Sequence, residues 1–170
     1  MACEDGFSLT ELLIVVAIML IIAAIAVPNL LRAKIAANES SAVHSVREIS
    51  TAELFYHSTY PQVGYAIDLK TLGGPTGSCS PSPATACILD STVSGGSKTG
   101  YSLFAAGFSF AGTTINTQFV ASSAPAIFDQ TGVRNFCVAT DDGSMRAHLG
   151  TVGGSPAPDV PTCLSYAILN

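Results

Sequence analysis

An unbroken apolar run of 16 residues, Leu12 to Val27, constrains this chain more than any other feature. As a helix it would cover about 24 Å, at about 1.5 Å per residue. With its flanks the segment extends to residues 7–31, which is long enough to cross about 30 Å of hydrocarbon. We therefore expect residues 7–31 to form a membrane-spanning half-helix.

The rest of the chain has a different composition. From Glu39 onward it is rich in Gly, Ser, Thr and Ala, and only 11% of all 170 residues are charged. The net charge is −5 and the few Lys and Arg are scattered, so we expect no nucleic-acid partner. This uneven distribution excludes a simple cytosolic enzyme and indicates a soluble domain attached to a membrane segment.

The N-terminal segment has two ordinary interpretations. A cleaved signal peptide would use Ala24-Ile25-Ala26 as its small-x-small site, but the leading residues include Glu4 and Asp5 instead of basic residues. A plain anchor helix leaves Glu11 unexplained, because a carboxylate at the edge of an apolar span is costly and usually functional.

The third interpretation comes from a resemblance. Gly6-Phe7-Ser8-Leu9-Thr10-Glu11, followed by LLIVVAIMLIIAAIAVPNLLRAK, closely resembles the start of type IV pilins and pseudopilins. The resemblance implies that residues 1–6 are a leader cut by a prepilin peptidase between Gly6 and Phe7, and that Phe7 is then N-methylated. It also implies that Glu11 guides subunits into a filament, and that Pro28 marks a helix kink near which some pilin filaments unwind.

The leader departs from the family pattern. MACEDG has no Lys or Arg, whereas Arg32 and Lys34 lie on the other flank, so the positive-inside rule does not support the expected topology. Either translation starts upstream of Met1, or insertion relies on another feature.

The chemistry of Glu11 can be argued from the residues alone. A carboxylate buried in a helix bundle needs a cation, and residues 1–31 contain no Lys or Arg. Cleavage would create a positive amine at Phe7, which could pair with Glu11 in the same chain or in a neighbouring copy. The second pairing would fix the stagger between subunits. The alternative is that Glu11 merely lies at the membrane surface.

Residues 32–60 read as an amphipathic continuation of the helix. Charged residues, Glu39 and Glu53 among them, mostly fall off its apolar stripe, and Pro61 disfavours helix at Tyr60. We therefore expect one helix from Phe7 to Thr59. The apolar stripe has helical spacing and consists of Ile35, Ala42, Val46, Ile49 and Tyr56.

Residues 61–99 read as a connecting loop rich in Gly, Pro and Ser, with one possible helical turn in AIDLKTLGG. Gly95-Gly96-Ser97-Lys98-Thr99 superficially suggests a phosphate loop. It fails because Ser97 replaces the glycine before the lysine and no strand precedes it, so we interpret it as a flexible turn.

Residues 100–149 read as an antiparallel sheet and residues 150–170 as a tail. Asp141-Asp142-Gly143 is a strong hairpin signal. The expected class is α+β and pilin-like, with the long helix packed on a roughly four-stranded sheet, and the lack of a second long helix excludes parallel βαβ folds. The expected strands are Tyr101–Phe110, Ile115–Ala121, Arg134–Thr140 and Ser144–Leu149.

Five cysteines are present, and Cys3 would leave with the leader. The other four suggest disulfides in an oxidising compartment and allow three pairings. Sequence neighbourhood favours Cys79–Cys87 within the loop and Cys137–Cys163 between a strand and the tail. Zinc and haem are not expected, because the C-x₂₋₄-C and C-x-x-C-H spacings are missing.

No catalytic residue, metal site or cofactor is predicted. The three histidines are isolated in the sequence, and the aspartates fit turn chemistry better than a calcium site of the kind that some secretion pseudopilins have, since no D-x-D-x-D-G loop occurs. These residues are His44, His57 and His148, and Asp129, Asp141, Asp142 and Asp159.

The resemblance makes a structural subunit the leading hypothesis. Such a subunit would be processed by a prepilin peptidase, held in the inner membrane, and passed by an inner-membrane assembly machinery into a homopolymer. The expected product is an extracellular type IV pilus-like filament at the cell surface. A type II secretion pseudopilin forming a short periplasmic filament is the alternative, and an enzyme tethered by a signal anchor is a distant third.

Overall fold

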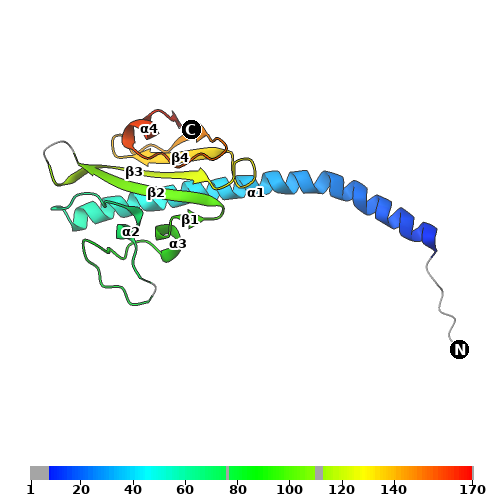
Figure 1. The fold of residues 1–170 in the computed structure, drawn as a ribbon, viewed down its shortest axis with the longest axis horizontal. Helices are drawn as coiled ribbons and strands as arrows, with labels where there is room; N and C mark the ends of the chain where they lie inside the picture. The colour runs from blue at the N-terminus through cyan, green and yellow to red at the C-terminus, as the bar shows by residue number, and fades with distance from the viewer. Residues whose placement is uncertain (1–7, 76, 110–112, 170) are drawn as a thin grey trace. The chain divides into compact units, whose positions relative to one another are not determined.

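The structure is a computed structural model that describes residues 8–75, 77–109 and 113–169. The chain divides into two compact units, Met1–Lys34 and Ile35–Asn170. The described helices are α1 (Leu9–Thr59), α2 (Leu69–Leu72), α3 (Ser91–Ser94) and α4 (Val160–Leu164) (Figure 1). The described strands are β1 (Ser97–Lys98), β2 (Tyr101–Ser109), β3 (Asn116–Pro125), β4 (Arg134–Ala139), β5 (Arg146–Leu149) and β6 (Ala167–Ile168).

The described part of the first unit is Ser8 and the first half of α1. Every described side chain up to Lys34 is exposed in the isolated chain. By length and composition, α1 contains a segment that is long and apolar enough to cross a membrane. A helix that is apolar all round must lie in lipid or among other helices.

The second unit is built on one antiparallel sheet. Its strand order is β1-β2-β3-β4-β5-β6, so each strand pairs with its neighbours along the chain. The expectation of about four strands was wrong, because two-residue strands stand at both edges. The interpretation of Gly95–Thr99 as a flexible turn was wrong as well, since Ser97 and Lys98 pair with β2.

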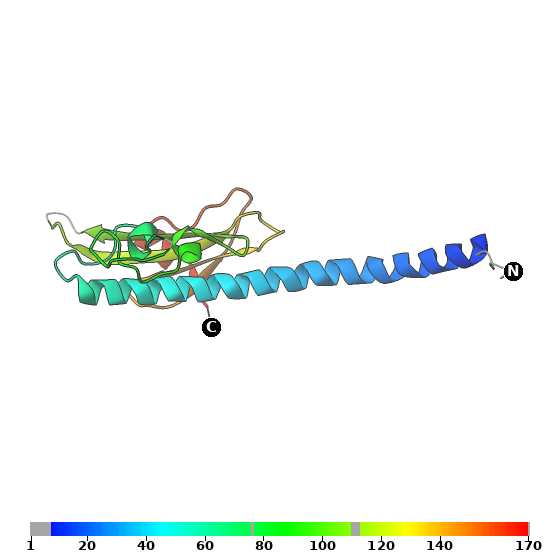
Figure 2. The same cartoon turned by 90° about the horizontal axis from the view of Figure 1, so that it is seen from below.

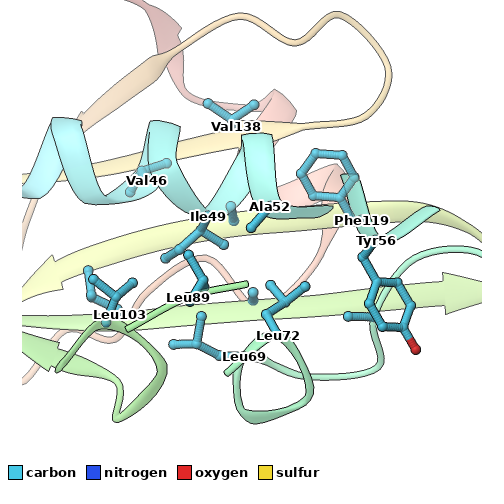
Figure 3. Packing of buried hydrophobic residues seen from close by; sticks show 14 of the residues in the cluster. Val46, Ile49, Ala52, Tyr56, Leu69, Leu72, Leu89, Leu103, Phe119 and Val138 are labelled. Atoms are coloured by element: carbon cyan, nitrogen blue, oxygen red, sulfur yellow. The ribbon is translucent and has the colours of Figure 1, made fainter. Parts of the chain in front are cut away.

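One face of the sheet packs on the second half of α1, which Figure 2 shows lying along it. Alternate residues of each strand point to this face, because successive side chains of a strand alternate. The core between them is closed by α2 and by the segment before α3. Figure 3 shows its packing, which includes Val46, Ile49, Ala52, Tyr56, Leu69, Leu72, Leu89, Leu103, Phe119 and Val138.

The opposite face of the sheet is covered by the C-terminal segment. Val120 and Cys137 point to this side and pack with Val160 and Cys163 of α4. The buried hydroxyl of Ser122 donates to the carbonyl of Ala157 at 2.8 Å. The sheet therefore lies between α1 and the segment that carries α4.

Candidate processing and assembly site

Glu11 lies in the first turn of α1 and is exposed in the isolated chain. Its Oε2 accepts a hydrogen bond from the backbone N–H of Ser8 at 3.0 Å. Ser8-Leu9-Thr10-Glu11 has the spacing of a capping box, in which a glutamate satisfies one of the free N–H groups at a helix start. Glu11 therefore stabilises the beginning of its own helix before any second copy is considered.

Gly6 and Phe7, the predicted cleavage and methylation positions, lie outside the described residues. The described chain begins one residue after Phe7, at Ser8, and α1 begins at Leu9. Cleavage between Gly6 and Phe7 would place the new amine four residues before Glu11, about one helical turn away.

Pro28 lies inside α1, and the helix continues through it without a break. Because proline has no N–H, the carbonyl of Ala24 loses the backbone donor that a helix normally supplies. Nearby, the side-chain amide of Asn29 donates to the carbonyl of Ile25 at 3.0 Å. The backbone here is held by fewer main-chain hydrogen bonds than elsewhere in α1, and unwinding near Pro28 in a polymer stays a prediction.

Glu39 fastens the second half of α1 to the start of β4. Its side chain is buried, with 6% of the residue exposed. The carboxylate accepts a hydrogen bond from the backbone N–H of Val133 at 3.1 Å and two from the guanidinium of Arg134, at 2.9 and 2.6 Å. Hydrogen bonds between charged partners are stronger than neutral ones. Asn38 adds a bond to the carbonyl of Thr131 at 2.9 Å.

Glu53 is fully buried under the sheet. One carboxyl oxygen accepts the backbone N–H of Ala66 at 2.8 Å, and the other has no hydrogen-bond partner among the described residues. Burial raises the pKa of Glu53 to about 8, and the bond from Ala66 lowers it by a smaller amount. Glu53 is therefore a neutral acid at neutral pH.

The expectation that Glu39 and Glu53 lie off the apolar stripe was wrong. Glu39 is four residues after Ile35 and Glu53 is four residues after Ile49, which places both carboxyl groups on the buried face. Helical spacing alone could have predicted that both side chains are buried. It could not predict their hydrogen-bond partners. Those of Glu39 are 94 and 95 residues further along the chain, and that of Glu53 is 13 residues further along.

Two disulfides are present, and they join the cysteines in the pairing that the sequence favours. Cys79–Cys87 closes the loop beside α2, with a Cα–Cα distance of 6.0 Å. Cys137–Cys163 joins β4 to α4, with a Cα–Cα distance of 5.8 Å. The second bond fixes the C-terminal segment to the face of the sheet that α1 does not cover.

The isolated histidines all have structural neighbours. His44 lies 3.9 Å from a carboxylate oxygen of Glu48, and the other two stack on tyrosines: His57 on Tyr65, and His148 on Tyr166. In the described part of the chain, no group of three or more His, Cys, Asp or Glu side chains could hold a metal ion.

The aspartates considered for calcium lie in three separate loops, and only Asp141 and Asp142 share one. Asp159 caps α4 by accepting the N–H of Thr162, and hydrogen bonds from Thr162 lower its pKa. Asp142 accepts from Ser144 and Arg146 in the β4–β5 turn, and these bonds lower its pKa. The remaining two also lie in turns: Asp141 accepts from Gln118, and Asp129 has a positive φ of 62°.

Comparison with known proteins concerns the N-terminal segment. Residues 1–27 match the family described as the prokaryotic N-terminal methylation motif. No match was found among curated proteins or among solved structures. The motif belongs to structural, pilin-type proteins and implies processing by a prepilin peptidase and assembly into a pilus-type polymer. The chain therefore carries the N-terminal signal of the type IV pilins and pseudopilins, and the apolar run of its long N-terminal helix lies within the matched residues.

Proposed function

We propose that this chain is the structural subunit of an extracellular type IV pilus-like filament, a homopolymer joined through the N-terminal helix. The observation that carries the proposal is the helix itself. Its 16-residue apolar run is exposed in the isolated chain, directly follows Glu11, and lies within the matched methylation motif. Such a surface must be covered by lipid before assembly and by other copies afterwards.

Hydrophobicity alone does not set the spacing between subunits. Lipid is as apolar an environment for Leu and Ile as a helix bundle is, so a specific polar contact has to fix the stagger. Glu11 is the only charged side chain from Phe7 to Leu31. We propose that its carboxylate pairs with the amine of Phe7 in a neighbouring copy, in a core where charges are weakly screened.

The intrachain bond to Ser8 makes a matched pair of variants informative. Glu11→Ala removes both the charge and the acceptor for the Ser8 N–H. Glu11→Gln keeps an acceptor oxygen and removes only the charge. We expect both variants to be cleaved and held in the membrane, and both to form few or no filaments, measured by electron microscopy of sheared cell-surface material. Abundant filaments from Glu11→Gln alone would show that Glu11 acts only as a helix cap.

The two disulfides of the second unit are typical of chains exposed to an oxidising environment, and one of them joins the C-terminal segment to the sheet. The periplasm and the cell surface are both oxidising, so these bonds support either location. A type II secretion pseudopilin in a short periplasmic filament is the alternative to the proposed surface filament. Polymer found only in the periplasmic fraction, with none in the sheared material, would favour that alternative.

A further inference from the structure

A long apolar groove runs beside α1 in the second unit. It has a volume of about 980 Å³ and lies between α1 and the segment from Pro81 to Leu89. The α1 wall is a second stripe of the helix, next to the stripe that faces the sheet, and its residues include His44, Thr51, Phe55 and Thr59. Phe55 is 59% exposed although it is large and apolar.

The other wall is firmly held. The disulfide Cys79–Cys87 closes it, and the N–H groups of Ile88 and Leu89 both donate to the carbonyl of Leu72, at 2.9 and 3.0 Å. The hydroxyl of Tyr56 on α1 donates to the carbonyl of Pro83 at 2.6 Å. These bonds hold the groove open in the isolated chain, so a ligand need not order it first.

We propose that this groove receives residues 12–27 of a second copy, which rests on the filament assembly proposed above. The groove and the apolar run have the same length. From His44 to Thr59 the α1 wall is 16 residues long, about 24 Å, and the apolar run of 16 residues is also about 24 Å. An apolar helix laid in an apolar groove is a common mode of recognition.

The charges at one end of the groove also match those of the inserted helix. Subunits related by one repeated screw operation point the same way, so the inserted helix runs roughly parallel to α1 and its Glu11 end lies at the His44 end. That end carries Arg47, for which no ion pair is found among the described residues, and Glu48, whose carboxylate lies 3.7 Å from the Nζ of Lys98 outside the groove. Because Lys98 offsets Glu48, Arg47 leaves this end with a net positive charge. Glu11 of the inserted helix therefore meets a cation, and its two oxygens can accept from Arg47 and from the Phe7 amine of a third copy together.

The chain offers a matched pair of positions for the test. Phe55 lines the groove, whereas its neighbour Leu54 is exposed to a similar extent, 55%, outside it. Phe55→Glu and Leu54→Glu each add one charge at an exposed position of α1. We expect both full-length variants to be cleaved and to form both disulfides. Phe55→Glu should reduce filament yield at least tenfold, and Leu54→Glu should stay within twofold of the unchanged chain.

Cross-linking locates the contact directly. Thr51→Cys, midway along the groove, is combined with single cysteines at residues 17, 18, 19 and 20, which together cover one turn of the apolar run. We expect oxidised filaments to give covalent dimers with one or two of these four, and none when Leu54→Cys replaces Thr51→Cys. Normal filament yield with Phe55→Glu would overturn the groove inference. Filaments that give no covalent dimer with any of the four cysteine positions would overturn it as well. Neither result would contradict the proposed filament. Lack of filaments from the unchanged chain would overturn both.

Discussion

Replacing Glu53 by glutamine should change how the stability of the second unit depends on pH. The native carboxyl group is buried, with one hydrogen bond from Ala66, and its pKa is raised from 4.5 to about 8. In the unfolded chain the group ionises near its ordinary value. Between pH 4.5 and about 8, unfolding therefore releases a proton. As pH rises through this range, the free energy of unfolding falls by about 1.4 kcal/mol per pH unit.

The loss should reach about 5 kcal/mol by pH 8 and change little above it, because both states are then ionised. Below pH 4.5 the group is protonated in both states and contributes no pH dependence. Glu53→Gln stays neutral throughout, and its free energy of unfolding should lack this slope. The difference between the free energies of unfolding of Glu53→Gln and the unchanged chain, taken at each pH, cancels the contributions of all the other carboxylates.

The assay is urea unfolding of the full chain in detergent, with its disulfides intact, at a series of pH values from 4 to 9. Tyrosine near-UV circular dichroism is the suitable signal, because the chain has five Tyr and no Trp, and all five tyrosines lie in the second unit. Glu53→Gln should gain stability relative to the unchanged chain as pH rises from 5 to 8. Parallel curves over that range would refute the claim that Glu53 is a neutral buried acid.

Further predictions concern processing and the attachments of the second unit. Gly6→Leu should block cleavage, so that intact mass shows a subunit that still carries residues 1–6. Replacing both Cys137 and Cys163 by serine should cost about 2–4 kcal/mol of stability and expose the C-terminal segment to protease without abolishing membrane insertion. Arg134→Ala should lower stability by about 1–3 kcal/mol, because Glu39 stays buried without its cation. Adding Glu39→Ala should cost less than the sum of the two single changes, as measured by urea unfolding.

Elements with a regular pattern could be predicted from the sequence. The long helix, the hairpin between β4 and β5, and the strand cores follow from helical spacing, a turn signal and β-prone runs. The edge strands could not be predicted, because two residues such as Ser97–Lys98 or Ala167–Ile168 form no alternation. The second half of β3 was missed because Ser122 and Ser123 look polar, although both are fully buried.

The partners of the acidic side chains on α1 could not be predicted from the sequence. Helical spacing places Glu39 on the inner face of α1, but only the folded chain brings Arg134 to it. For Glu11 the sequence gives the position and the structure gives the bond to Ser8. Its partner in a polymer depends on a second copy, which no property of a single chain determines.

The N-terminus of the polymerised protein distinguishes a processed filament subunit from any other product of this chain. Sheared surface material would be examined by electron microscopy, and the subunit of the same preparation would be measured by intact mass and N-terminal fragmentation. We expect filaments whose subunit begins at an N-methylated Phe7 and retains Glu11 and the whole apolar run. Filaments whose subunit begins at Met1 or at Val27 would contradict it.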